Sequence, residues 1–359
     1  MAKDFNSYFT FIYVSLTEYE KKVLYAIIKY PTANDREIAE KAEVKQSTVA
    51  AIRKRLRKEG YFTTVAIPML QNVGAELLVF THASFNPVIP LSKRLEITEK
   101  KIEAFEEIVF SLGEEDKGFS IGFSKNYTDI ARINDIRTKT FGKLGLLEKE
   151  YPDIAVFPFK ISKTYRFFDF SHPLRETFGI DDNDNRIDNF FKIDEKNLSK
   201  NEKKLLCSIV KNPELNSKQL SSMLGLTRHT IGRLKRKFLN EGYLKIINIP
   251  DFKKLGFCLL AFYHILFDPH NPPNFEKDGI KEIINDETIL MAAREFESIL
   301  ISIHSSYEAY KSSNTIILQK LKENGWIAKN PLVKIYSLNK TVIIKNLNFY
   351  PIVNKLLFC

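Results

Sequence analysis

Cysteine is scarce in this chain of 359 residues, and a long apolar run is missing. Cys207, Cys258 and Cys359 are far apart and odd in number, so they form neither a disulfide framework nor a zinc-ligand pattern. This cysteine usage is typical of a reducing compartment such as the cytoplasm. The most apolar stretch, from Leu255 to Phe267, is much shorter than the roughly 20 residues that a membrane-spanning helix needs. We therefore expect no membrane span.

Signatures of enzymatic chemistry and of secretion are also lacking. Gly118 to Gly122 match the G-x-S-x-G pattern, but Ser120 falls within an alternating strand, whereas a nucleophile elbow is a sharp strand-to-helix turn. Walker and dinucleotide fingerprints do not occur in the sequence. The amino-terminal residues carry an acid at Asp4 and no small-residue cleavage site, so we expect no signal peptide. The sequence predicts no enzymatic activity, no cofactor and no metal.

Acidic residues are in the minority. The chain has 54 Lys and Arg against 44 Asp and Glu, which leaves a net charge of +10. A positive surplus favours an anionic partner, such as nucleic acid or a membrane surface. The apolar share of 44% and the charged share of 27% are typical of a folded globular protein. The length is enough for two to four domains with substantial cores.

The chain contains an internal repeat. KEGYFTTVAIP, from Lys58 to Pro68, returns 182 residues later as NEGYLKIINIP. The same register extends without a gap over residues 16–74 and 198–256, and 16 of the 59 positions are identical. Chance would give about three or four identities, so we interpret the chain as a tandem duplication.

Each copy begins with two helix start signals. In the first copy Thr17 is followed three residues later by Glu20, and Asn34 by Glu37, which is the capping-box pattern. The second copy repeats both signals at the same offset. Pro31 separates the two helices, and Pro213 matches it in the second copy. The pattern predicts two short helices that precede a third.

The third predicted helix of each copy has one apolar stripe and an otherwise basic surface. Residues 45–58 contain six Lys or Arg and no acid, and residues 227–239 contain five, together with His229 and again no acid. A solvated charged face usually mixes both signs, so this bias favours contact with nucleic acid. Gly60 and Gly242 end the helices, and the β-branched residues beyond them predict a strand pair, or wing.

Three helices and a wing predict a winged helix-turn-helix, whose third helix enters the major groove of DNA. The first turns of that helix reach base edges, and its cations reach phosphates. The predicted DNA-contacting residues of the first copy are Lys45, Gln46, Ser47, Thr48, Arg53, Lys54 and Arg57. Those of the second copy are Thr227, Arg228, His229, Thr230, Arg233, Lys235 and Arg236. Binding of a protein by either winged helix is the alternative.

After each winged helix the pattern predicts a ferredoxin-like βαββαβ unit, so the fold class is α+β. Helices are expected at residues 99–107 and 279–286 and from Tyr127 and Tyr307, and one last strand region closes each half. The predicted divisions are 1–75 and 199–257 for the winged helices, 76–180 and 258–359 for the βαββαβ domains, and 181–198 for a polar linker.

This order of elements resembles the Lrp/AsnC (feast/famine) family of prokaryotic transcription regulators. The resemblance rests on Thr48-Val49, Leu56, Glu59-Gly60-Tyr61, Pro68 and Val73-Gly74, and on Thr230-Ile231, Phe238, Glu241-Gly242-Tyr243, Pro250 and Leu255-Gly256. It covers nearly the whole chain twice and implies a dimer-like pair of units in one polypeptide. The family also implies an amino-acid effector near a Gly- and Asp-containing turn. Residues 113–116 match that turn but residues 293–296 do not, so an effector is left open.

The sequence therefore predicts a sequence-specific transcription regulator that binds double-stranded DNA through two unlike winged helices, on an asymmetric promoter site. The expected location is the cytoplasm, in association with the nucleoid. The alternative is an interaction protein in which one winged helix holds DNA while the other, or a βαββαβ domain, recruits the basal transcription machinery. The two hypotheses differ in whether both basic helices are needed for DNA affinity.

Overall fold

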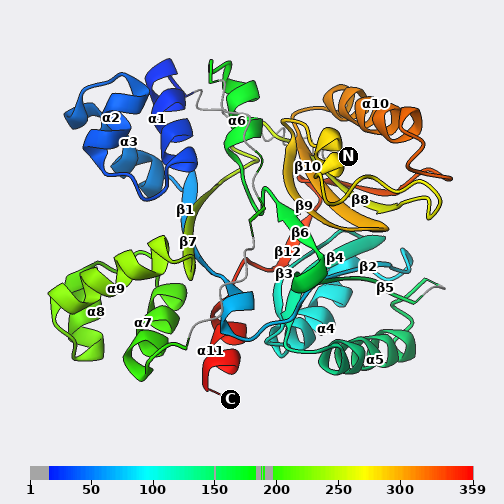
Figure 1. Cartoon of the computed structure of the whole chain (residues 1–359). Coiled ribbons are helices and arrows are strands. Elements are labelled where there is room, and N and C mark those ends of the chain that lie inside the picture. The colour runs from blue at the N-terminus through cyan, green and yellow to red at the C-terminus, as the bar shows by residue number, and fades with distance from the viewer. Residues whose placement is uncertain (1–15, 149–150, 183–186, 188, 191–196, 359) are drawn as a thin grey trace, which may run out of the picture.

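The computed structural model describes residues 16–148, 151–182, 187, 189–190 and 197–358, and Figure 1 shows their arrangement. The amino-terminal segment considered for a signal peptide, and most of the predicted linker, lie outside these residues. None of the helices in the described ranges is long and apolar enough to cross a lipid bilayer.

Three helices begin each half of the chain. They are α1 (Glu18–Lys29), α2 (Asp35–Ala42) and α3 (Gln46–Lys58) in the first half, and α7 (Lys200–Lys211), α8 (Ser217–Leu224) and α9 (Arg228–Asn240) in the second. The predicted capping boxes are present at Thr17, Asn34, Ser199 and Asn216. Each side chain accepts a hydrogen bond from the backbone N–H three residues on, so these helix starts are satisfied locally.

The third helices pack into their units through the predicted apolar stripe. The buried residues are Val49, Ile52 and Leu56 on α3, and Ile231, Leu234 and Phe238 on α9. Their spacing of three and four residues places them on one side of each helix. The opposite side of each helix is therefore free of the core.

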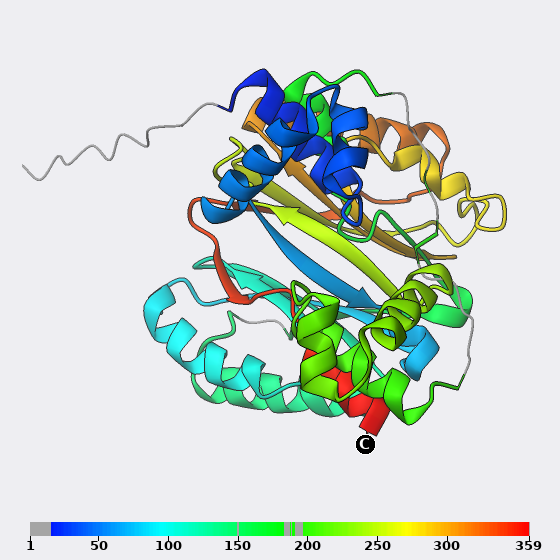
Figure 2. The same ribbon diagram turned by 90° about the vertical axis from the view of Figure 1, so that its left-hand side faces the viewer.

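A single strand leaves each unit, and the two strands pair with each other. β1 (Phe62–Pro68) and β7 (Leu244–Pro250) form an antiparallel ribbon in which Val65 lies opposite Ile247. Figure 2 shows this ribbon crossing between the two units. The prediction of a wing, a strand pair within each copy, is wrong. After β1 the chain does not turn back to form a second strand of the same unit, because the 3-10 helix η1 (Leu70–Val73) leads it into a larger sheet. The backbone groups of β1 are instead paired by β7, the equivalent strand of the second copy.

The two remaining sheets follow the predicted βαββαβ order, except that the second has a 3-10 segment in place of its first helix. The first contains β2 (Leu77–Ser84), β3 (Ile108–Gly113), β4 (Lys117–Ser124) and β5 (Asp153–Pro158), with α4 (Leu91–Glu103) and α5 (Tyr127–Lys143). The second contains β8 (Leu259–Leu266), β9 (Thr288–Arg294), β10 (Glu297–His304) and β11 (Leu332–Ser337), with η3 (Gly279–Ile283) and α10 (Tyr307–Glu323). In both, the fourth strand lies beside the first, then the third and the second.

Each sheet takes a fifth strand from the other half of the chain. β6 (Lys163–Tyr165) pairs with β9, and β12 (Val342–Lys345) pairs with β3. The expectation of one closing strand region per half is therefore wrong, because each region divides between two sheets. Pro158 ends β5, since proline has no N–H for the ladder. The exchange joins the two halves through backbone hydrogen bonds.

Two predicted helices also differ from the structure. The helix expected at residues 99–107 is α4, which begins earlier because Pro90 occupies its N-cap, where a missing N–H costs nothing. The helix expected at residues 279–286 is only the short 3-10 segment η3. Asp278 has a left-handed backbone and Ile284 is already extended, so the segment between them is too short to nucleate an α-helix.

Each half ends in a helix that returns to its own three-helix unit. α6 (Ser171–Phe178) packs against α1, and α11 (Tyr350–Phe358) packs against α7. Buried residues of both helices join one large apolar core with the three-helix units, the ribbon and strands of both sheets. The three-helix units are thus part of one continuous core with the sheets.

Candidate nucleic-acid interface

Both third helices lie on the side of the molecule away from the two large sheets (Figure 1). Three residues separate the end of α3 from β1, and three separate the end of α9 from β7. The β1–β7 ribbon therefore determines how far apart the two helices are. The two units form one pair of potential recognition surfaces on a shared strand support.

The first turn of α3 is open to solvent. Lys45, which is the N-cap residue, is exposed, as are Gln46 and Ser47, and Thr48 is half-buried. Lys54 is exposed on the same face as Ser47, because seven residues make two helical turns. These five predicted residues are therefore placed where an external partner can reach them.

The first turn of α9 is also open, but its cap is occupied. Thr227 Oγ1 accepts a hydrogen bond from Thr230 N at 3.2 Å and lies 2.9 Å from Thr230 Oγ1. The hydroxyl of half-buried Thr230 is thus partly used within the helix. The predicted residues with exposed side chains on this helix are Arg228, His229, Arg233 and Arg236.

Arg53 and Lys235 occupy equivalent positions, but their surroundings differ. Arg53 Nε lies 2.7 Å from Asp35 Oδ1, and its Nη2 donates to Ala33 O at 3.1 Å, so Arg53 joins α3 to the start of α2. Ser217 stands in the place of Asp35 in the second unit. Lys235 is half-buried and has no ion-pair partner among the residues that the structure describes. Burial lowers the pKa of Lys235 below the usual lysine value.

Arg57 faces the other half of the molecule. Its Nε lies 3.7 Å from Glu214 Oε1, and its Nη2 donates to Thr64 Oγ1 at 3.4 Å. Its guanidinium also lies over the ring of Phe62. The side chain is therefore engaged with the ribbon and the second unit, although it is exposed.

Two further cations of the third helices stabilise the units internally, and the sequence analysis missed them. Arg55 pairs with Glu20, and at the equivalent positions Lys237 Nζ lies 2.6 Å from Glu202 Oε1. Burial would raise the pKa of Glu202, but hydrogen bonds from Lys237 and Ser199 outweigh it and lower the pKa to about 2. The signal was present in the sequence, because acid and base recur at the same offset in both copies.

Polar contacts between the units were also missed. Thr64 Oγ1 donates to Asn248 Oδ1 at 2.7 Å across the ribbon, and Asn248 Nδ2 donates to Ile27 O of α1 at 2.9 Å. Lys254 Nζ donates to Glu59 O, at the end of α3, at 2.5 Å. No sequence signal could have revealed these contacts, because they depend on the pairing of two strands that are distant in the chain.

The turn that the family resemblance associates with an effector is occupied by the chain itself. Glu114 is buried and accepts hydrogen bonds from Ser337 N, at the end of β11, and from Thr341 Oγ1, in the connection between β11 and β12. Lys117 Nζ lies 3.2 Å from the same carboxylate. The turn is thus covered by the exchanged strand region of the other half.

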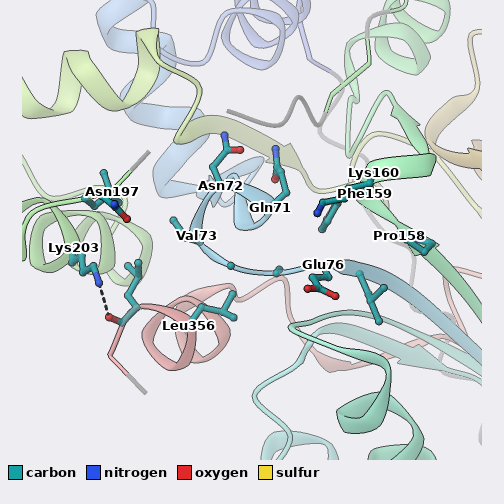
Figure 3. Close-up of a pocket in the computed structure, with 15 residues that line it drawn as sticks. Gln71, Asn72, Val73, Glu76, Pro158, Phe159, Lys160, Asn197, Lys203 and Leu356 are labelled. Atoms are coloured by element: carbon teal, nitrogen blue, oxygen red, sulfur yellow. Dashed lines mark hydrogen bonds between the residues drawn. The ribbon is translucent and has the colours of Figure 1, made fainter. Parts of the chain in front are cut away.

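A pocket of about 570 Å³ lies where the connection after β1 meets α7 and α11 (Figure 3). Polar groups dominate the labelled lining: Gln71, Asn72, Glu76, Lys160, Asn197 and Lys203. Lys203 Nζ donates to Leu357 O at 3.4 Å. The pocket is remote from the exposed faces of α3 and α9, and no predicted DNA-contacting residue lines it.

The G-x-S-x-G motif at residues 118–122 gives little support for enzymatic activity. Ser120 is buried in the middle of β4, and Arg137 Nη1 donates to its hydroxyl at 3.2 Å. The strand-to-helix turn of a nucleophile elbow is not formed at these residues. Among the described residues, no group of three or more His, Cys, Asp or Glu is arranged to hold a metal ion.

Comparison with known proteins gives three kinds of likeness. Residues 14–69 match the family model described as sugar-specific transcriptional regulator TrmB. An uncharacterized HTH-type transcriptional regulator of Pyrococcus furiosus is 28% identical over 129 residues, which cover 35% of this chain and 84% of the relative. The crystal structure of the siroheme decarboxylase NirDL superposes over 95% of this chain and 98% of its own, with a TM-score of 0.50 and 12% identity.

A shorter likeness concerns a transcriptional regulatory protein of the AsnC family from Pyrococcus furiosus. It covers 40% of this chain and 89% of that protein, with a TM-score of 0.31 and 17% identity. At 12% identity the likeness to the decarboxylase concerns the fold alone. The match over residues 14–69 spans α1, α2, α3 and the ribbon strand β1. These helices are therefore a helix-turn-helix domain of the type found in transcriptional regulators.

Proposed function

We propose that this chain is a sequence-specific DNA-binding transcription regulator, and that it arose by tandem duplication of a helix-turn-helix unit followed by a βαββαβ domain. In this proposal α3 and α9 each contact one half-site. Because their exposed residues differ, the two half-sites are unlike, and one chain covers an asymmetric promoter site. The half-sites would lie about one helical turn, roughly 34 Å, or a multiple of it, apart.

The ribbon is the observation that supports this proposal most strongly. It brings the strand that follows α3 into register with the strand that follows α9, and both helices lie on the same side of the molecule. In a homodimer the same geometry would present two identical helices and select a palindrome. Here Gln46 and Ser47 of one helix correspond to Arg228 and His229 of the other, so the geometry is pseudo-symmetric while the reading surface is not.

The proposal includes no enzymatic activity and places the protein on cytoplasmic DNA. The positive net charge and the exposed arginines of α9 favour phosphate contacts, which dominate the affinity of such proteins. No catalytic role is assigned to Ser120, whose buried hydroxyl accepts a hydrogen bond from Arg137 Nη1 of α5.

The proposal is tested by selecting bound DNA from a random pool and footprinting one complex with hydroxyl radicals. Sedimentation of the same complex gives the number of chains. One chain under an asymmetric footprint is expected. Two chains on a palindrome would contradict the proposal. Exchanging Arg228 and His229 for the Gln and Ser found at residues 46 and 47 is expected to make the selected half-sites more alike.

A second candidate is favoured by the composition of the first unit. Around Ser47 and Lys54, the exposed face of α3 carries Ala50 and Ala51, and Arg53 and Arg57 are engaged within the molecule. A face with so few free cations is suited to a protein partner. In this second proposal α9 holds DNA and α3 recruits a component of the transcription machinery.

One comparison distinguishes the two candidates. Lys45→Ala with Lys54→Ala weakens DNA binding if α3 contacts DNA, and it leaves DNA affinity unchanged if α3 contacts a protein. The matched change on the second helix, Arg233→Ala with Arg236→Ala, weakens DNA binding in both cases. Loss of transcriptional response without loss of DNA affinity in the α3 variant would favour the recruiting protein.

A further inference from the structure

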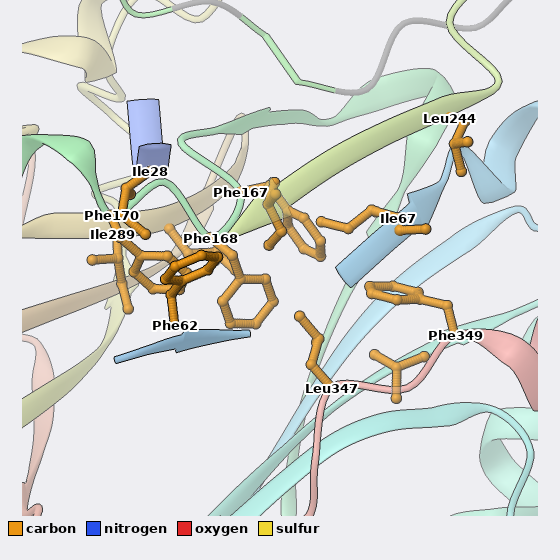
Figure 4. Close-up of a cluster of buried hydrophobic side chains, with 14 of the residues drawn as sticks. Ile28, Phe62, Ile67, Phe167, Phe168, Phe170, Leu244, Ile289, Leu347 and Phe349 are labelled. Atoms are coloured by element: carbon orange, nitrogen blue, oxygen red, sulfur yellow. The ribbon is translucent and has the colours of Figure 1, made fainter. Parts of the chain in front are cut away.

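A second pocket, of about 590 Å³, lies at the other end of the ribbon from the polar pocket of Figure 3. Its lining comes from the ribbon strands β1 and β7, the faces of both large sheets, and several connections. These connections lie between β6 and α6, directly after β7, and on either side of β12. Figure 4 shows Phe62, Phe168, Phe170 and Ile289 grouped together where β1 passes the sheets. The volume of this second pocket lies within the usual range for small-molecule sites.

The lining is mostly apolar and rich in aromatic rings. The ring centroids of Phe110 and Phe168 are 6.0 Å apart, those of Phe168 and Phe170 6.2 Å, and those of Phe170 and Phe252 5.0 Å. Rings at these separations contact one another in tilted or edge-to-face geometry and leave their remaining surfaces for a third group. A ligand that contains a ring would therefore find several aromatic partners.

Charge is confined to two side chains of the lining. The carboxylate of Asp251 is engaged, because Lys254 N donates to it at 3.2 Å and Lys254 Nζ lies 3.6 Å away. Lys253 is exposed and has no ion-pair partner among the residues that the structure describes. The available charge is thus one ammonium, and it complements a single negative charge on the ligand.

The repeat supplies an internal comparison for this pocket. Lys253 corresponds to Gln71, and Phe252 to Leu70, in the register of the repeat. Gln71 lines the pocket of Figure 3 at the opposite end of the ribbon, so equivalent connections produce one mixed and one mainly apolar pocket. The cluster of several aromatic rings, and a lysine at this position of the connection, are therefore not required by the repeated scaffold.

We propose that this cavity binds a small, ring-containing apolar molecule with one anionic group, and that Lys253 pairs with that group. The ligand would lie against Phe62 and Thr63 of β1 and against Ile249 and Pro250 of β7. Phe62 and Thr63 begin β1 shortly after α3, and they pair with Pro250 and Ile249 at the far end of the strand that follows α9, so occupancy would change the relative placement of the two helices. This second part rests on the proposed function, whereas the binding itself does not.

The experiment uses the full chain and two matched probes. One is 8-anilinonaphthalene-1-sulfonate, which joins two aromatic ring systems to one anionic group, and the other is the uncharged N-phenyl-1-naphthylamine. Fluorescence titration is expected to show one saturable site per chain, with the sulfonate bound about tenfold more tightly because of the charge-assisted contact. Equal affinity for the two probes would overturn the assignment of an anion.

Three variants locate the site. Lys253→Gln is expected to reduce the affinity for the sulfonate to that of the uncharged probe, while Lys277→Gln, at another exposed lysine, changes neither affinity. Thr63→Trp fills the cavity from an exposed position of the ribbon and is expected to weaken both probes at least tenfold. Thermal unfolding verifies that each variant is folded. Unchanged binding of both probes to Thr63→Trp would place the site elsewhere and overturn the proposal.

Coupling to DNA is measured separately. Saturation with the sulfonate is expected to change DNA affinity, and DNA must then change the affinity for the probe by the same factor. Probe binding at the cavity by a chain that binds no DNA would reject the proposed function and leave the site standing. DNA binding without a probe site would reject the cavity alone. DNA affinity that is indifferent to bound probe would overturn the coupling.

Discussion

The third helices of the two units share their buried side and differ on their exposed side. The buried positions carry Val49, Ile52 and Leu56 in α3, and Ile231, Leu234 and Phe238 in α9. The exposed face of α3 carries a glutamine, a serine, two alanines and a lysine at residues 46, 47, 50, 51 and 54, whereas that of α9 carries a histidine and three arginines at residues 228, 229, 233 and 236. Close packing restricts the volume and shape of the buried residues, while solvent imposes no such restriction on the exposed ones. The proposed function therefore depends on exposed residues that the packing of the helices does not restrict.

The largest expected difference concerns DNA affinity. Arg233→Ala with Arg236→Ala is expected to flatten the dependence of log affinity on log salt by about two, and Lys54→Ala by about one. Two units correspond to about an order of magnitude in affinity between roughly 50 and 200 mM salt. Titrations at four salt concentrations measure the slopes. Equal slopes for the two variants would remove the functional difference between the helices.

The shared scaffold predicts similar losses of stability in both units. Glu20→Gln and Glu202→Gln each remove a capping-box carboxylate and an ion pair to the third helix, so each is expected to lower the free energy of unfolding by about 1–2 kcal/mol. Urea unfolding at pH 7 measures both. A loss confined to one variant would show that the units are not equivalent scaffolds.

The effect of Glu202 depends on pH in a defined direction. Its pKa falls from 4.5 to about 2 in the folded protein, so the stabilisation is complete above pH 4.5 and is lost as the pH falls through about 2. The difference between the wild type and Glu202→Gln should therefore shrink between pH 4.5 and 2. A difference that is constant over this interval would mean that the carboxylate is not ionised in the folded protein.

A smaller effect comes from exchanging the environments of Arg53 and Lys235. Ser217→Asp supplies Lys235 with the carboxylate that Arg53 already has, and it is expected to flatten the salt slope by about one. Asp35→Ser is the matched change, and it should release Arg53 and steepen the slope by a similar amount. If neither slope changes, the position contacts no phosphate in either unit.

The smallest effect is expected at Arg57. Arg57→Leu introduces the residue type found at the equivalent Leu239, and it removes an exposed ion pair with Glu214, which contributes about 0–1 kcal/mol. The free energy of unfolding should fall within that range, and the salt slope should stay the same. A slope lowered by about one would instead assign Arg57 to DNA, as the sequence analysis predicts.

Local patterns predicted the three-helix units well. Capping side chains such as Thr17 and Asn216, and the apolar stripe of each third helix, act within a few residues of chain, so their physical cause is visible in the sequence. The wing and the closing strands were predicted less well. An isolated strand such as β1 has the same residue pattern whether its partner is the next segment or one 182 residues away.

In the candidate interface, too, some features could be predicted from the sequence and others could not. Exposure of the first turns of α3 and α9 follows from the stripe, because the residues opposite buried ones face solvent. The roles of individual cations do not follow from it: Arg53 meets Asp35, Arg57 meets Glu214, and Lys235 meets no described acid. The sequence shows how many cations a helix carries, but the neighbours of each cation in the folded protein decide whether it is already paired within the molecule.

The repeat, the basic third helices and the succession of four strands in each large sheet were determined by the sequence itself, through spacing, caps and periodicity. The pairing of β1 with β7, the exchange of β6 and β12, and the two unlike pockets at the ends of the ribbon were decided by the tertiary structure. A strand carries hydrogen-bonding groups on both edges, but these groups are the same in every strand and do not specify which strand will pair with it. The partner is chosen by which arrangement buries the apolar faces of both halves in one core.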